Sequence, residues 1–360
     1  MLRTDIIFHS ETMLRLLLLL LLLLPLSLLS GSVSLSPSEV WSALWDEGNE
    51  TLRFIVWESR LPQTATALLA GMALSAVGLV LQTLFANPLA DPSLLGIHSG
   101  ASLGAAVSFL LFGGSFSLGV LTAGGLCLTV FSAFLGACGV ILLLALCSRI
   151  VHGTLGLLIV GVMISFAVSA LVSLLSFYAA ADGLQQFIVW GFGSFANVGL
   201  EILPFFAGLI FLALLLLLPF VPALDALLLG DDYARNLGIR VRRSRTLLLL
   251  LGGFLVAVTT SLCGPISFIG MAVPHLARLS LRSGSHRRLL PATLLWGGNI
   301  ALLALMLSHL PGERGTFPLA AITPLFGVPA VLWVLLRKRR DIYCIVPKLR
   351  KQSQWQSQLQ

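Results

Sequence analysis

Lysine, which contacts the nucleotide phosphates in the Walker A motif, is almost absent from this sequence. Lysine occurs only at Lys338, Lys348 and Lys351. The pattern G-x-x-x-x-G-K-[ST], whose backbone amides and lysine cradle nucleotide phosphates, is therefore missing. We infer that the chain does not hydrolyse ATP by that route.

Two short motifs match catalytic or cofactor-binding patterns without the context those patterns need. Gly100 to Gly104 fits G-x-S-x-G, but a nucleophile elbow requires a strand-to-helix turn, and this run lies inside an apolar segment. Residues 191–196 fit the dinucleotide fingerprint, yet no strand precedes them. The spacing of Gly96, Gly100 and Gly104 instead predicts a small-residue helix face for close packing, and Gly71 suggests a similar face.

Histidine and cysteine residues are not grouped as a metal or catalytic centre. There is no C-x-x-C pair and no histidine at ligand spacing from a cysteine. His152, His275 and His309 fall at different depths or ends of the apolar segments, which argues against a membrane enzyme. We predict no bound metal, no cofactor and no enzymatic activity for this chain.

The composition defines the elements that must position any functional residue. Of the 360 residues, 57% are hydrophobic and only 10% are charged, against roughly a quarter charged in soluble domains. Apolar runs recur along the chain, with the charges in short gaps. These features exclude a soluble globular protein, a disordered chain, a disulfide scaffold and a nucleic-acid-binding domain.

The apolar runs predict an all-α, polytopic membrane protein with ten transmembrane helices, the eighth being short. The predicted segments are 14–29, 61–83, 94–112, 118–146, 154–178, 202–221, 246–262, 268–281, 289–309 and 319–336. We therefore divide the chain into an N-terminus (1–13), a ten-helix transmembrane domain (14–336) and a basic tail (337–360).

The distribution of basic residues predicts the orientation. Basic loops remain in the cytoplasm, and an even number of spans puts both termini on one side. The tail is strongly basic, so we place both termini in the cytoplasm. Of the 22 basic residues, only Arg53, Arg60 and Arg314 then lie on the side of the membrane opposite the cytoplasm.

The first apolar run has two interpretations. The leucines followed by Ser30, Gly31 and Ser32 resemble a cleaved secretory signal, whereas the same run also serves as an uncleaved span. We favour the span. Both interpretations leave the N-terminus inside.

Several polar or helix-breaking residues lie at the membrane, where each is costly unless it packs inward or lines water. They are Gln82, the loop Asn87-Pro88-Leu89-Ala90-Asp91-Pro92, the break at Gly264 and Pro265, and Pro274 with His275. The loop is either a rigid turn capped by its Asn and Asp or a functional element. His275 is either a relay or ligand, or a hydrogen-bonded structural group. Interrupted helices of this kind line transport pathways.

The longest predicted cytoplasmic loop, residues 222–245, is predicted to form two short helices broken at glycine. Asp231 and Asp232 occupy a first helical turn, and Gly238 suits a C-terminal cap. The loop either rests on anionic lipid through its arginines or inserts into a groove on a cytoplasmic partner.

From residue 60 to residue 336 the chain resembles the FecCD-type (BtuC-like) permeases of bacterial ABC importers for ferric siderophores, haem and vitamin B12. The motifs that carry the resemblance are Arg60-Leu61-Pro62, Gly78, Gln82, Asn87-Pro88-Leu89-Ala90-Asp91-Pro92, Trp190, Gly193-Ser194, Leu229-Gly230, Leu237-Gly238, Gly264-Pro265-Ile266, Pro274-His275, Arg287-Arg288-Leu289-Leu290-Pro291 and Gly327. One departure is Gln63, which stands where this family usually has a second arginine.

The resemblance implies a set of partners in the bacterial inner membrane. A second permease chain, identical or a paralogue, would complete the pathway. Two cytoplasmic ATPase subunits would hold ATP and Mg, a periplasmic or lipoprotein binding protein would deliver substrate, and lipid would surround the spans. The implied ATPase-coupling residues are Gly230, Asp232, Ala234, Arg235, Leu237 and Gly238. Arg60 is either a docking residue for the binding protein or an interfacial anchor, and Arg314 is a second docking candidate.

We therefore predict the permease subunit of an ATP-driven ABC importer, with Gln82, Asn87, Pro88, Gly264, Pro265, Pro274 and His275 as pathway or gate residues. The alternative is an ion-coupled secondary transporter of a small solute. That class needs carboxylates within the spans, whereas Glu201, Asp182 and Asp225 map to edges or loops. The sequence does not distinguish between a ferric siderophore, haem and cobalamin as the substrate.

Overall fold

The structure is a computed structural model that describes residues 2–45, 49–112, 115–118, 121–124, 126–151, 154–312, 315–325 and 327–329. This part of the chain is almost entirely helical, so the expected helical membrane fold is confirmed. A two-stranded antiparallel hairpin of β1 (Ser115–Leu118) and β2 (Leu121–Gly124) is the exception. It corrects the start of the fourth predicted segment, which we had placed at Leu118.

The helices follow one another with short connections. In chain order they are α1 (Leu2–Leu29), α2 (Pro37–Trp45), α3 (Glu50–Phe54), η1 (Ile55–Arg60), α4 (Leu61–Leu84), η2 (Pro92–Leu95), α5 (Ile97–Ala106), η3 (Val107–Leu111), α6 (Leu126–Ile150), α7 (Thr154–Tyr178), α8 (Ala181–Gly191), η4 (Phe195–Asn197), α9 (Leu203–Leu217), η5 (Leu218–Phe220), α10 (Val221–Leu227), α11 (Asp231–Asn236), α12 (Val241–Cys263), α13 (Ile269–Leu281) and α14 (His286–Ser308).

Each of the ten predicted segments overlaps a helix in the described part of the chain, whereas α2, α3, α8 and α11 lie in the connections between them. Seven of the ten are long and apolar enough to cross a membrane: Ser10–Leu29, Glu50–Leu84, Cys127–Ser148, Gly156–Tyr178, Leu203–Leu227, Val241–Cys263 and His286–Ser308. The other three are shorter, namely α5 with η3, α13, and the helix at Leu319–Pro329. The eighth segment, α13, is short as predicted.

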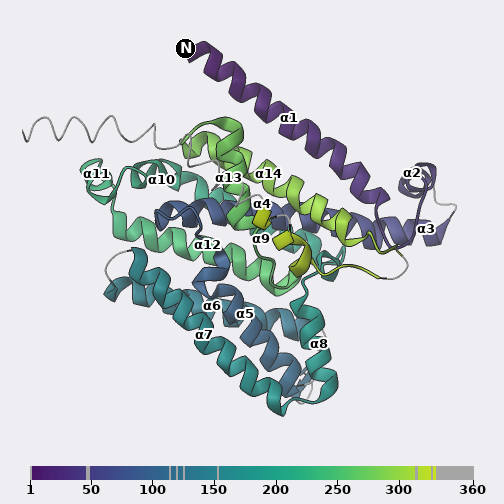
Figure 1. Cartoon of the computed structure of the whole chain (residues 1–360). Coiled ribbons are helices and arrows are strands. Elements are labelled where there is room, and N and C mark those ends of the chain that lie inside the picture. The colour runs from purple at the N-terminus through teal and green to yellow at the C-terminus, as the bar shows by residue number, and fades with distance from the viewer. Residues whose placement is uncertain are drawn as a thin grey trace, which may run out of the picture.

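Helix α4 is the centre of the bundle, and it contacts α1, α9, α12, α13 and α14 (Figure 1). Two of its glycines allow backbones to meet. A β-carbon added at Gly71 would lie 2.2 Å from the Gly297 carbonyl oxygen of α14, and one at Gly78 would lie 1.8 Å from the Gly270 carbonyl oxygen of α13. Where lipid supplies no hydrophobic drive, such close approach gives helix pairs their packing energy.

The predicted glycine stripe on the third segment is confirmed at two of its three positions. Gly100 and Gly104 of α5 lie against the backbone of α6 at Gly136 and Ser132. Gly96 instead precedes α5 with a φ of 74°, where it caps the helix in the left-handed region. Its role is therefore conformational.

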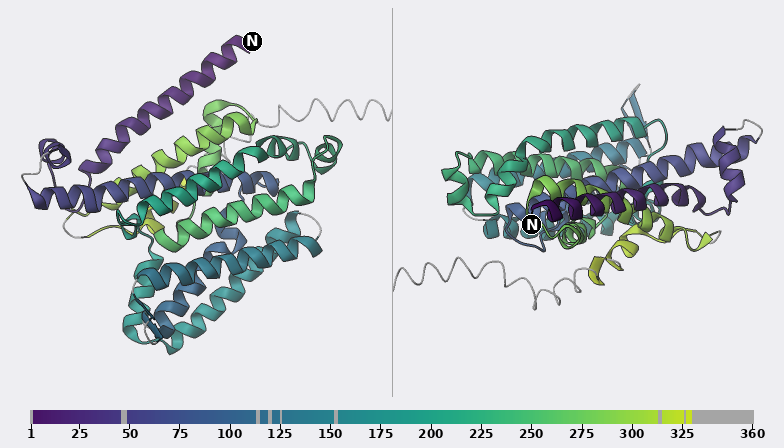
Figure 2. Two further views of the ribbon diagram at one scale, coloured as in Figure 1. Left: turned by 180° about the vertical axis from the view of Figure 1, so that it is seen from behind. Right: turned by 90° about the horizontal axis from the view of Figure 1, so that it is seen from above.

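Helix α1 packs along α14, as Figure 2 shows. Asn299 of α14 donates a hydrogen bond to the Leu16 carbonyl oxygen at 3.2 Å, and Ser27 donates to the Thr64 hydroxyl of α4 at 3.1 Å. These interhelical bonds lie inside the bundle, which supports the interpretation of α1 as a span.

Candidate transport and coupling site

The connecting segments gather at two opposite ends of the molecule (Figure 1). One end, here called the α11 end, carries α10, α11 and the start of α12. The other, the α8 end, carries α2, α3 and α8. Segments that were predicted to lie on the same side of the membrane lie at the same end of the molecule. At the α11 end, Ser285 and His286 donate hydrogen bonds to Asp225 of α10. At the α8 end, the Ser194 N–H donates to the Cys263 carbonyl oxygen.

At the α11 end, the loop of residues 222–245 has the predicted local structure. Its helices α10 and α11 are separated at Gly230, and Asp231 and Asp232 lie in the first turn of α11. Gly238 has a φ of 81°, and its N–H donates to the Arg235 carbonyl oxygen at 2.9 Å. A left-handed glycine thus ends α11, as expected of a C-terminal cap.

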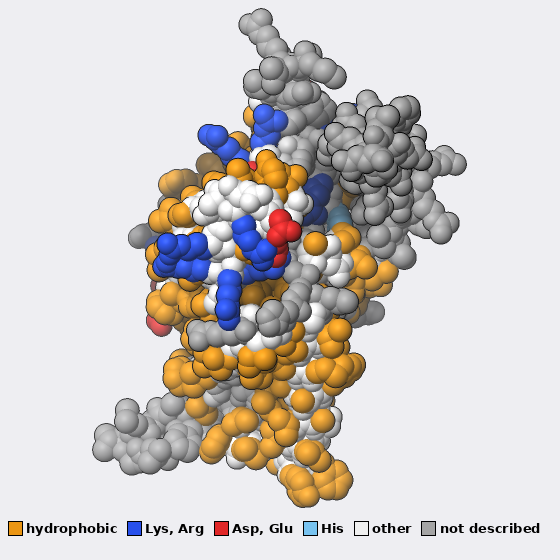
Figure 3. Space-filling model, turned by 90° about the vertical axis from the view of Figure 1, so that its left-hand side faces the viewer, with side chains coloured by type: hydrophobic (Ala, Val, Ile, Leu, Met, Phe, Trp, Pro, Cys, Tyr) orange, Lys and Arg blue, Asp and Glu red, His pale blue; other side chains and the backbone are white. Residues whose placement is uncertain are grey.

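The exposed surface of this loop is formed by basic and apolar side chains. The two aspartates of α11 are already paired, since Arg245 binds Asp231 with two hydrogen bonds of 2.9 and 2.8 Å and Arg235 binds Asp232 at 2.8 Å. Ala234 is fully buried, whereas Leu237 is 59% exposed. A cleft of about 760 Å³ is lined by Arg235, Ile239, Arg240, Val241, Arg242, Arg243 and Thr246. Figure 3 shows the arginine side chains on this face.

Three of the predicted pathway residues meet where α4 ends. Gln82 donates to the Met271 carbonyl oxygen of α13 at 3.0 Å and accepts a hydrogen bond from Arg278 at 2.5 Å. His275 Nε2 lies 2.7 Å from the Pro88 carbonyl oxygen. The last turn of α4, the loop after it and α13 are thereby joined, and this supports the structural interpretation of His275.

The loop from Asn87 to Pro92 is a turn held by its own side chains. The Asn87 carboxamide oxygen accepts from the Leu89 N–H at 2.9 Å. Asp91 is 3% exposed and caps η2, accepting from the Ser93 N–H at 3.1 Å and the Ser93 hydroxyl at 2.6 Å. Asp91 thus caps the next helix as predicted, whereas Asn87 closes a turn within the loop, and both bonds support a rigid turn.

The Gly264-Pro265 break lies towards the α8 end, away from the residues just described. Gly264 ends α12 with a φ of 75°, and a β-carbon there would lie 2.6 Å from the Trp190 carbonyl oxygen. Phe268 then starts α13 in the left-handed region, and Pro274 lies inside α13. The interrupted helix is confirmed, but the structure divides the predicted pathway residues between two places instead of bringing them together.

A cleft of about 970 Å³ opens at the α8 end. Its polar lining is mostly uncharged and includes Gln63, Gln185, Gln186, Asn197, Ser194, His309 and Asp182, and its aromatic lining includes Trp190, Phe192 and Phe317. Burial lowers the pKa of His309, and the nearby Arg60 charge lowers it further. Neutral hydrogen-bonding groups beside aromatic rings suit a bulky, amphipathic solute.

Arg60 points into the protein. Its side chain is 4% exposed, and its guanidinium donates to the carbonyl oxygens of Leu28 at 2.6 Å, Leu29 at 3.0 Å and Val33. It therefore caps the end of α1, a role that the sequence did not indicate. Its predicted docking role stays a prediction, and the other docking candidate, Arg314, lies outside the described residues, as does the basic tail.

We expect Arg60→Lys to destabilise the protein although it keeps the charge. Lysine cannot reproduce the planar fork that reaches three carbonyl oxygens. Losing two buried, charge-assisted hydrogen bonds should cost about 3 kcal/mol. The melting temperature of the detergent-purified chain, compared with that of a Gln63→Lys variant one turn further along the helix, checks this. An unchanged melting temperature together with weaker binding-protein affinity would instead support docking.

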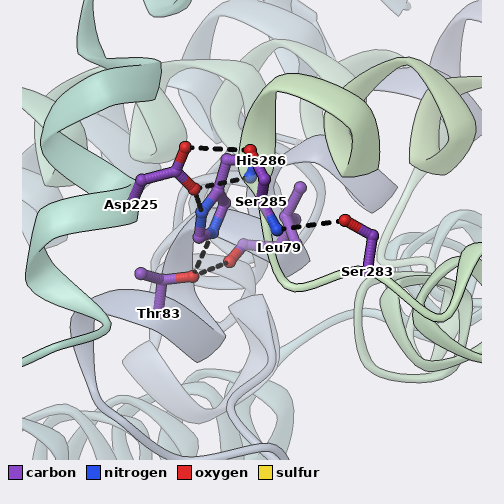
Figure 4. A network of polar contacts seen from close by, with 6 residues as sticks. All are labelled: Leu79, Thr83, Asp225, Ser283, Ser285 and His286. Atoms are coloured by element: carbon purple, nitrogen blue, oxygen red, sulfur yellow. Dashed lines mark hydrogen bonds and ion pairs between the residues drawn. The ribbon is translucent and has the colours of Figure 1, made fainter. Parts of the chain in front are cut away.

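One polar cluster at the α11 end was not predicted from the sequence (Figure 4). His286 Nδ1 lies 2.8 Å from Asp225 Oδ1, and His286 Nε2 lies 2.7 Å from the Thr83 hydroxyl. Asp225 had been noted only as a loop carboxylate. The sequence indicates only that His286 lies near the start of a span. No local pattern pairs it with Asp225 or Thr83, which lie 61 and 203 positions earlier in the chain.

Among the described residues, no group of three or more His, Cys, Asp or Glu side chains is placed to hold a metal ion.

Comparisons with known proteins cover almost the whole chain. The family model described as the FecCD transport family matches residues 18–337. The hemin transport system permease protein HmuU of Yersinia pestis is 36% identical, over 86% of this chain and 91% of the relative. The vitamin B12 import system permease protein BtuC of Citrobacter koseri is 34% identical, over 88% and 93%.

Two solved structures also resemble this chain in fold. An inward-facing metal-chelate type ABC transporter superposes with a TM-score of 0.79 at 31% identity, covering 91% of this chain and 99% of that chain. The PsaBC complex of Streptococcus pneumoniae superposes with a TM-score of 0.52 at 16% identity. The second likeness concerns the fold alone.

Proposed function

The chain belongs to the FecCD transport family, and we propose that, as the permease subunit of an ABC importer, it carries an iron chelate, haem or a corrinoid across the bacterial inner membrane. The observation that carries this proposal is the end-to-end similarity to permeases for hemin and vitamin B12, together with the missing nucleotide-binding motif. The cleft at the α8 end, with amide and aromatic lining, suits such bulky substrates.

The two ends of the molecule take different partners in this proposal. The α11 end faces the cytoplasm, where the basic and apolar surface of α10 and α11 receives the ATPase subunit that binds ATP and Mg. The α8 end faces the binding protein, and a second permease chain completes the pathway. Both termini are then cytoplasmic, as the positive-inside rule favours.

Reconstitution tests the proposed function. We expect proteoliposomes that contain this chain, the ATPase and the binding protein encoded beside it to accumulate one of three labelled solutes: a ferric siderophore, haem or cobalamin. Uptake should need ATP inside and cease when the lysine of the ATPase's phosphate-binding loop is replaced. Uptake that continues without ATP and collapses with an ionophore would favour the ion-coupled alternative.

A further inference from the structure

We propose that Thr83, Asp225 and His286 form a positioning clamp that ties the ATPase-facing helices to the transmembrane helices, an inference that rests on the coupling role proposed above for α10 and α11. These three residues are here called the α10 clamp. They come from three helices, α4, α10 and α14, that are far apart in the sequence.

The carboxylate of Asp225 holds the first residues of α14. Its Oδ1 accepts from the His286 backbone N–H at 2.6 Å and lies 2.8 Å from His286 Nδ1, and its Oδ2 accepts from the Ser285 hydroxyl at 3.1 Å. The first N–H groups of a helix lack partners within that helix, and a carboxylate from a neighbouring helix satisfies one here. Asp225 therefore caps α14 from α10.

The imidazole of His286 carries the connection on to α4. Its side chain is fully buried. Since the Asp225 carboxylate only accepts, Nδ1 carries the proton of the neutral ring and Nε2 accepts from the Thr83 hydroxyl at 2.7 Å, and the Leu79 carbonyl oxygen at 2.9 Å is the alternative acceptor for that one hydroxyl proton. Figure 4 shows the ring lying between Asp225 and Thr83. Because the ring contacts a different helix through each nitrogen, α10 cannot move away from α4 and α14 without breaking these bonds.

The helical hydrogen-bond ladder is interrupted between α9 and α10. Between α9 and α10 the chain passes through the 3-10 turn η5, with prolines at 219 and 222 that cannot donate helical hydrogen bonds. The clamp bypasses this joint. It ends on Thr83 of α4, next to Gln82, which holds α13. A displacement of α10 by the ATPase is thereby transmitted to α4, α13 and α14.

Two variants break the clamp without removing bulk: Asp225→Leu, which removes both acceptor oxygens, and Thr83→Val. The matched controls are Thr83→Ser, which keeps the hydroxyl, and Ser283→Ala, which lies in the same connection but contacts the network only through a 3.4 Å bond to the Ser285 N–H. In the reconstituted importer, both clamp variants should assemble, and the number of solute molecules imported per ATP hydrolysed should fall about tenfold. Both controls should keep the wild-type ratio.

A second measurement needs no ATPase. In the permease chain alone, amide hydrogen exchange in Val221–Leu227 should accelerate about tenfold in the two clamp variants and stay unchanged in the controls. Unchanged exchange and an unchanged import ratio would overturn the clamp, as would equal losses of import, hydrolysis and melting temperature. The proposed function fails separately, when the wild-type complex imports without ATP.

Discussion

Replacing Gly78 with valine should prevent the permease from accumulating as a folded protein. A β-carbon at this position would lie 1.8 Å from the Gly270 carbonyl oxygen and 2.4 Å from its carbonyl carbon. Both atoms belong to the backbone of α13, so no side chain can rotate away. Helix α4 is also held by α14 about two turns earlier on the same face, where Gly71 meets Gly297, so it cannot tilt away from α13 without disturbing that contact.

We expect this substitution to cost more than about 3 kcal/mol, which is above the typical range for overpacking because the clash is with backbone. Expression yield, the size-exclusion profile and the melting temperature in detergent measure the effect. Gly139→Val is the matched control, because a β-carbon at Gly139 of α6 meets nothing within 4 Å. If Gly78→Val elutes and melts like the control, the close contact between α4 and α13 does not exist in the membrane.

The second large effect is expected from Gly238→Pro, which should disrupt the ATPase-facing loop and leave the membrane domain intact. Gly238 has a φ of 81°, and its N–H bonds to the Arg235 carbonyl oxygen, whereas proline fixes φ near −65° and has no N–H. The end of α11 must then change direction, and the exposed Leu237 moves with it. Because a β-carbon at Gly238 meets nothing within 4 Å, the bundle itself is not disturbed.

A misplaced loop of this kind should weaken association with the ATPase by roughly 100-fold, corresponding to about 3 kcal/mol for a proline in an incompatible position. Co-purification and a binding titration with the detergent-solubilised ATPase measure it. Gly238→Asn is the control, because asparagine tolerates the left-handed region. Wild-type affinity in Gly238→Pro would place the ATPase contact elsewhere on the chain.

Local features of the site were predictable because their causes lie within a few residues. Gly230 and Gly238 delimit α11 because both have positive φ, a backbone conformation that glycine adopts most readily. Asp91 caps the next helix through Ser93, two residues away. The hairpin of residues 115–124 was missed because hydropathy alone cannot distinguish an apolar strand from an apolar helix, although Ser115, Ser117 and Thr122 disfavour a helix.

The sequence by itself determined the membrane class, the ten apolar segments and the family, since these depend on composition, segment length and the order of motifs. Only the tertiary structure decided where the polar side chains point. It turned Arg60 inward onto α1 and joined His286 to Asp225 and Thr83 across 61 and 203 positions. Helical periodicity fixes the face on which a side chain lies, but the partner it meets depends on the packing of distant helices, which no local pattern encodes.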